Sequence, residues 1–169
     1  MLKVDSERYK NAFLYLLEKL KTIEGKKKAC KLFYFLDFDF FEAYAKSFTG
    51  DIYIKKKMGP VPSYLEDIYE ELSKAGFIKI KKIKTNISYE NDTVIYESVI
   101  TNKKMLEIEK TFSKEELKML NRIARVYGNL NGKQLEDLSH SQAPWLGVDM
   151  FQEIPYELSY YRETEGLTN

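Results

Sequence analysis

The residue types that most often carry chemistry are scarce in this chain, which has one cysteine and one histidine. A zinc site draws about four ligands from cysteine, histidine and carboxylates. A nucleophilic cysteine–histidine pair could be formed only by Cys30 and His140, and Cys30 lies in an apolar run, where cysteine usually packs as a small hydrophobic residue. Glycine-rich nucleotide motifs and the nucleophile elbow are absent from the sequence. We therefore expect no catalytic residue, no metal site and no cofactor.

Three acidic residues lie close together in and after the same apolar run. Asp37 and Asp39 are two residues apart, so on a helix they point to different sides and form no acid–base pair. Glu42 follows Asp39 by three residues and shares its side. A carboxylate among apolar residues needs a partner. We expect a lysine or arginine to pair with one of these acids, with His140 as a candidate partner for Asp37.

A lysine-rich run is the candidate patch for nucleic acid or another partner, and its residues are Lys79, Lys81, Lys82 and Lys84. The alternative is an edge strand whose lysines discourage pairing with other strands. Overall charge gives no support to nucleic-acid binding, because 27 basic residues nearly balance 26 acidic ones. Nucleic-acid binding is therefore a secondary hypothesis.

Hydrophobic periodicity and capping residues predict the helices that position these side chains. The expected ranges are 6–20, 26–46, 63–75, 113–128 and 131–140, with a further helix after Pro155. The second range is apolar on nearly every face between Leu32 and Leu36, which predicts a central buried helix. Ser113 and Glu116 have the spacing of a capping box.

Two β-prone runs, 77–84 and 94–101, flank a polar loop and predict an antiparallel pair. After the helix 63–75, they follow the order of a winged helix-turn-helix. In that arrangement the helix would face DNA, yet its outer side carries four acids against Lys74, which opposes contact with phosphates. We predict an α+β fold: a mainly helical single domain, 1–169, with a small antiparallel β element in a winged-helix-like order.

Composition points to the cytoplasm. A single cysteine allows no internal disulfide, which suits a reducing compartment. The first residues do not form a basic segment followed by an apolar run, so no secretory signal is predicted. The richest apolar run, 32–41, contains Asp37 and Asp39 and is half the length that a bilayer requires. We expect a cytoplasmic protein without membrane contact.

Three stretches occur in a distinctive order: 31–37 reads KLFYFLD, 58–65 reads MGPVPSYL and 139–145 reads SHSQAPW. In this order and spacing they resemble the SocA-like antitoxin domain, also called the Panacea domain, of prokaryotes and their phages. The resemblance spans about 14–145, and the tail 151–169 has no counterpart. The motif residues are Lys31, Leu32, Tyr34, Asp37, Gly59, Pro60, Val61, His140, Pro144 and Trp145.

The resemblance implies a non-enzymatic antitoxin whose partner is a protein, the cognate toxin encoded beside it. Members of that family are thought to neutralise diverse toxins, and one acts as an adaptor that delivers its toxin to a protease. Direct contact with a co-encoded toxin is therefore the leading hypothesis. The alternative is a DNA-binding transcriptional regulator that uses the lysine-rich run.

The motif residues also have structural interpretations. Gly59 permits a turn that Pro60 then holds. His140 lies near a helix end, where it can interact with the last carbonyl groups. We expect Trp145 to fill the core, with Pro144 stiffening its approach. For these residues a structural role is expected over direct contact with a partner.

Overall fold

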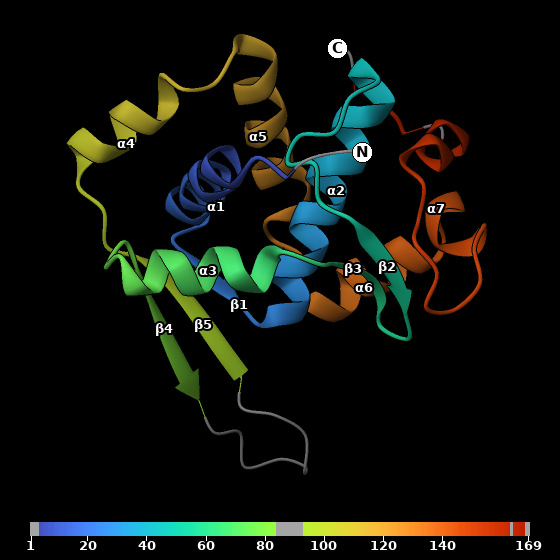
Figure 1. Ribbon diagram of the computed structural model, residues 1–169, viewed down its shortest axis with the longest axis horizontal. Helices are drawn as coiled ribbons and strands as arrows, with labels where there is room; N and C mark the ends of the chain where they lie inside the picture. The colour runs from blue at the N-terminus through green and yellow to red at the C-terminus, as the bar shows by residue number, and fades with distance from the viewer. Residues whose placement is uncertain (1–3, 84–92, 163, 168–169) are drawn as a thin grey trace.

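Helix α2 (Lys26–Tyr44) is the centre of the fold in the computed structural model, which describes residues 4–83, 93–162 and 164–167 (Figure 1). Every residue of 31–40 is buried, so nearly three turns of the helix have no exposed face. This confirms the predicted central helix. It ends two residues before the expected Lys46 because Ala45 adopts a left-handed conformation with φ 55°.

Three further helices surround α2, and their ranges agree with prediction to within a residue. They are α1 (Ser6–Leu20), α5 (Lys114–Tyr127) and α6 (Gly132–His140). Helix α5 lies against both α1 and α2, while α6 packs on α2. The Ser113–Glu116 capping box of α5 is present, and Asn131 with Gln134 forms a second one at the start of α6.

A three-stranded antiparallel sheet has the order β1-β5-β4, with β1 at Thr22–Glu24, β5 at Thr93–Ser98 and β4 at Ile78–Ile83. The β4–β5 pair confirms the predicted antiparallel runs, with Ile80 opposite Tyr96. Strand β1 was not predicted, because three residues are too few to show alternation. The loop expected between β4 and β5 falls in 84–92, outside the described residues.

A separate two-stranded hairpin, β2 (Tyr53–Lys56) and β3 (Gly59–Pro62), follows α2 and precedes α3 (Leu65–Lys74). The prolines of β3 are compatible with a short strand at the edge of a sheet. Because this hairpin stands between α2 and α3, where a helix-turn-helix has a tight turn, the winged-helix-like order is not confirmed. The predicted α+β fold class is confirmed, since helices predominate and both sheets are small and antiparallel.

The remaining helices lie at opposite sides of the molecule (Figure 1). Helix α4 (Asn102–Glu109), not predicted, is an outer helix that buries only Ile108. Helix α7 (Ala143–Leu146) and the 3₁₀ helix η1 (Tyr156–Tyr161) pack against each other. The tail therefore forms a 3₁₀ helix where we expected a further helix, and η1 lies on α2. Among the described residues, no helix combines the length and apolarity needed to cross a membrane.

Candidate functional site

The three motif stretches meet on one flank of α2, beside the β2–β3 hairpin (Figure 1). Lys31 Nζ of α2 donates to the Pro60 carbonyl of β3 at 2.7 Å. Trp145 Nε1 of α7 donates to the Lys56 carbonyl of β2 at 3.3 Å. Residues separated by as many as 89 positions thus form one unit.

Lys31 and Gly59 dock the hairpin on α2. The Lys31 side chain is buried, and desolvation lowers its pKa to about 8. Gly59 has φ +100°, and a Cβ atom built there would lie 2.6 Å from Lys31 Cε and 2.9 Å from Ser139 Oγ. The motif therefore requires glycine at this position for two reasons, its backbone conformation and the close approach of Lys31.

Asp37 joins α2 to the chain that follows it. Its carboxylate accepts hydrogen bonds from the Phe48 and Thr49 N–H groups at 2.8 and 2.7 Å, from Thr49 Oγ1 at 2.6 Å and from the Tyr53 hydroxyl at 2.7 Å. Burial raises its pKa to about 6, against the effect of these donors. The prediction that His140 is the partner of Asp37 is therefore wrong. The Asp37 carboxylate instead accepts hydrogen bonds from nearby N–H and O–H groups.

Asp39 and Glu42 share one arginine from the tail. Arg162 Nη2 lies 2.7 Å from Asp39 Oδ1 and 2.7 Å from Glu42 Oε2, and its side chain is fully buried. The Tyr127 hydroxyl donates to Asp39 Oδ2 at 3.0 Å. The expectation that an arginine pairs with one of these acids is confirmed. Sequence reasoning missed Arg162 itself, because the tail has no motif and lies 123 positions from Asp39.

Trp145 does not fill the core as expected; it is half-buried on the surface of the hairpin. Its ring stacks on His140 with centroids 4.1 Å apart, and Lys55 Nζ lies 4.1 Å from the centroid of the Trp145 ring. Lys55 Nζ also donates to the Val148 carbonyl at 2.7 Å. The indole is therefore held in place by contacts on the outside of the protein.

Exposed apolar side chains lie at the tip of this hairpin and on the segment that is hydrogen-bonded to β2 through Trp145 and Phe151. Their exposed fractions are 55% for Met58, 61% for Leu146, 40% for Met150 and 72% for Phe151. We call this surface the hairpin platform, and its residues are Lys56, Lys57, Met58, Trp145, Leu146, Met150 and Phe151. Sequence reasoning did not find Met58, Leu146, Met150 or Phe151, since no periodic pattern marks an apolar residue as exposed.

Backbone hydrogen bonds join residues 147–153 after α7, which we call the return segment, to β2. Phe151 N donates to the Lys55 carbonyl at 2.8 Å, and Lys55 N donates to the Gln152 carbonyl at 2.9 Å. Ile54 also forms a bridge with Glu153. The segment after α7 thus extends the small sheet, which fixes the position of Phe151 beside the hairpin.

The lysine-rich run lies elsewhere, on β4. Lys79 and Lys82 are exposed, whereas Lys81 Nζ pairs with Glu97 on β5 at 2.8 Å. Lys84 lies outside the described residues. Part of the charge of this patch is therefore compensated within the sheet. The structure does not bring these lysines together with the motif residues.

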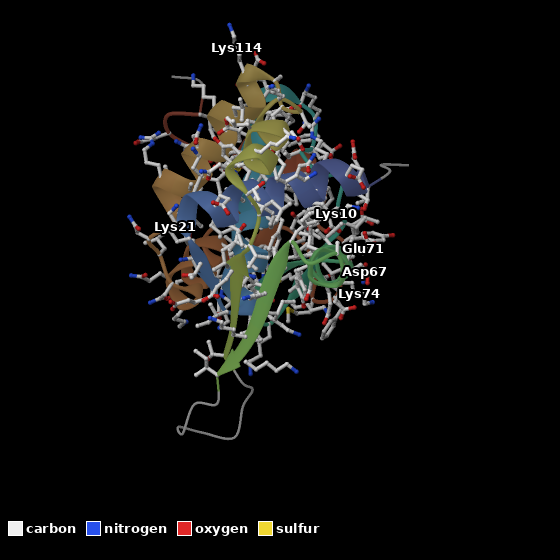
Figure 2. The ribbon with its side chains drawn as sticks, turned by 90° about the vertical axis from the view of Figure 1, so that its left-hand side faces the viewer. Lys10, Lys21, Asp67, Glu71, Lys74 and Lys114 are labelled. Atoms are coloured by element: carbon white, nitrogen blue, oxygen red, sulfur yellow. The ribbon has the colours of Figure 1, made fainter. Side chains whose placement is uncertain are left out.

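A cleft of about 490 Å³ lies between α1, α3 and the start of α4. Figure 2 labels Lys10 of α1 close to Asp67, Glu71 and Lys74 of α3. Lys10 Nζ lies 2.6 Å from a carboxylate oxygen of Glu7 and 3.4 Å from one of Glu71. The charged groups at the rim of this cleft therefore largely neutralise one another.

No group of three or more histidine, cysteine, aspartate or glutamate side chains suited to a metal ion occurs among residues 4–83, 93–162 and 164–167. Cys30 packs against the core, and burial raises the pKa of its thiol. A raised pKa reduces the thiolate fraction and with it the reactivity of the sulfur. Its packing and raised pKa are therefore consistent with the unreactive role expected for Cys30.

Comparison with known families gives a match over most of the chain. A family model described as "Antitoxin SocA-like, Panacea domain" matches residues 30–146. The matched range begins one residue before Lys31 and ends one residue after Trp145, so it contains all three motif stretches. Among curated proteins and solved structures, the comparisons found no match.

Proposed function

This chain belongs to the family of SocA-like antitoxins with a Panacea domain, and on that premise we propose that it neutralises a co-encoded toxin by direct contact. Family membership points to a non-catalytic role. The buried acids of α2 are consistent with this, because Asp37 and Asp39 are occupied by structural hydrogen bonds and an ion pair.

The observation that carries the proposal is that the matched range presents apolar side chains to solvent on the β2–β3 hairpin and on α7. Met58 and Leu146 both lie within 30–146 and are more than half exposed. Clustered exposed apolar side chains are typical of surfaces that bind another protein. A protein partner therefore fits this surface better than a small molecule or a nucleic acid.

Expression of the adjacent gene tests the proposal. We expect the neighbouring product to arrest growth when expressed alone and growth to recover when this chain is expressed with it. The two purified proteins should form a complex in size-exclusion chromatography. A harmless neighbour, or toxicity that this chain does not relieve, would contradict the proposal.

A proteolysis adaptor is the second form that this function could take, as the family resemblance implies. The two forms differ in the fate of the toxin. Neutralisation by contact alone leaves the amount of toxin in the cell unchanged, whereas an adaptor shortens its half-life. Following the toxin by immunoblot after synthesis is stopped, with and without this chain, separates the two.

A further inference from the structure

We propose that the hairpin platform is the surface that contacts the toxin, and that it accepts an apolar side chain flanked by carboxylates. The inference deepens the proposed function and rests on it, since the occupant is the toxin itself. It assigns a binding role to the return segment after α7, which lies beyond the matched range 30–146.

Phe151 is the first argument for this surface. Its side chain is 72% exposed, and its backbone has φ +67°, a left-handed conformation that costs free energy for any residue with a bulky side chain. The hydrogen bond from Phe151 N to the Lys55 carbonyl holds this conformation. A strained backbone that turns a large apolar ring toward water does nothing for the core, and such strain gathers at binding sites.

The neighbours of Phe151 make the surface suited to a protein. The Trp145 ring contacts both His140 and Lys55, which restrict its motion. It therefore loses little conformational freedom when a partner binds over it. Met58 and Met150 are flexible and can adapt to the shape of a partner. Rigid aromatic rings beside adaptable side chains are the usual composition of binding hot spots and of surfaces that accept varied partners.

Charge specifies the partner's chemistry. The hairpin carries the lysines Lys55, Lys56 and Lys57 in succession, and the last two are exposed at the tip beside Met58. The exposed acids Asp149 and Glu153 belong to the return segment, on either side of Phe151. The tip itself is therefore basic, and carboxylates on the toxin would complement it.

The cleft between α1 and α3 is the competing surface, and it is less suited to this partner. Lys10, one of the lysines that line it, already has two carboxylates of this chain within 3.4 Å. A toxin that bound there would have to displace these ion pairs. At the hairpin tip, the apolar side chains and two ammonium groups are presented directly to solvent.

Two platform variants with matched controls test the inference. Phe151→Asn removes the ring and keeps a residue that tolerates the left-handed conformation, and its control is Leu106→Gln on α4, an exposed apolar residue on the opposite side of the molecule. Lys56→Glu with Lys57→Glu reverses the charge of the tip, and its control is Lys79→Glu with Lys82→Glu on β4. Thermal unfolding of each purified variant verifies the fold.

We expect Phe151→Asn to weaken binding of the purified toxin by at least about tenfold without lowering the melting temperature. The charge reversal at the tip should slow association and weaken the dependence of binding on salt. Both controls, Leu106→Gln and Lys79→Glu with Lys82→Glu, should bind as the wild type does. Platform variants that bind the toxin with wild-type affinity would overturn the inference.

The outcomes separate this inference from the proposed function. A wild-type chain that does not bind the neighbouring product overturns both. A wild-type chain that binds it, with unchanged affinity in the platform variants, overturns the platform alone. A wild-type dimer that becomes a monomer in Phe151→Asn, with toxin binding retained, would assign the platform to self-association and also overturn it.

Discussion

At the residue scale, the buried polar side chains of α2 each join the helix to a different part of the chain. Lys31 binds the hairpin, Asp37 binds the segment after α2, and Asp39 binds Arg162 of the tail. A buried polar group without a partner is costly, so each of these residues stabilises one specific arrangement and disfavours others. This explains polar residues in an otherwise apolar helix without any catalytic role.

Asp37 should make stability depend on pH. Its pKa is about 6 in the folded protein against an ordinary 3.8, so between these values the folded state binds more protons than the unfolded state. Stability from this group is fully present below pH 4 and is lost as pH rises toward 6, by on the order of 3 kcal/mol. The measurement is urea unfolding from pH 4 to pH 7, in wild type and Asp37→Asn.

Asp37→Asn should remove that pH dependence while keeping Oδ1 as the acceptor for both the Phe48 and the Thr49 N–H groups. Asp37→Ala leaves these donors buried without a partner and should cost about 1–3 kcal/mol more than Asp37→Asn at pH 7. Equal stability of the two variants at pH 7 would contradict the role of these hydrogen bonds.

Gly59→Ala should destabilise the protein by about 2–4 kcal/mol, because it combines an unfavourable φ with a clash against Lys31. Gly25→Ala is the matched control: Gly25 has φ +92°, but nothing lies within 4 Å of a Cβ built there. Its cost should be smaller, about 1–3 kcal/mol, from backbone conformation alone. Denaturant midpoints measure both, and equal losses would rule out the close approach as a cause.

At the element scale, the tail is a structural part of the domain although the family match ends at residue 146. Residues after α7 pair with β2, and η1 brings Arg162 to α2. Thr164 N also donates to Glu42 Oε1 at 2.8 Å, and Leu167 is buried. The tail therefore packs on α2 through η1 and through Thr164, while the residues just after α7 pair with β2.

Arg162→Met should be strongly destabilising, by about 3–5 kcal/mol, since it leaves the buried Asp39 carboxylate without its main partner. Thermal or urea unfolding measures the loss, with Arg125→Met on the exposed side of α5 as a control expected within about 0.5 kcal/mol of wild type. Adding Asp39→Asn to Arg162→Met should restore part of the stability. A double variant as unstable as the sum of both changes would argue against coupling.

At the scale of the whole molecule, opposite charges lie on different elements. The outward side of α3 carries exposed acids, whereas β4 carries exposed lysines on an edge strand of the sheet. The acids of α3 are Glu66, Asp67, Glu70 and Glu71. A long nucleic acid that contacts β4 would also approach α3, where its phosphates would be repelled.

We therefore expect Lys79→Glu with Lys82→Glu to leave the affinity for duplex DNA unchanged over a range of salt concentrations. Fluorescence anisotropy with a labelled duplex measures this. A loss of affinity of tenfold or more, together with a smaller salt dependence, would favour the DNA-binding regulator over a protein-binding role for this strand.

The sequence alone determined the local elements and the family. Helix ranges and caps follow from periodicity and from residues within four positions of each other, so α1, α2, α5 and α6 were predictable. The side of α3 that packs on the core, with Leu65, Ile68, Tyr69 and Leu72, was predictable for the same reason. The ordered motif stretches were sufficient to indicate the antitoxin family that the match over 30–146 shows.

Only the tertiary structure decided which distant segments meet. The need of Asp39 for a basic partner was predictable from its place in an apolar run. That this partner is Arg162 depends on the path of the tail. Trp145 lies outside the core, and Phe151 reaches the hairpin, because β2 pairs with the segment after α7. A local pattern records which side of an element is covered, and it holds no information about the segment that covers it. The motif residues Lys31, Gly59 and Asp37 make their contacts within the fold, whereas the proposed contact surface combines segments that only the folded chain brings together.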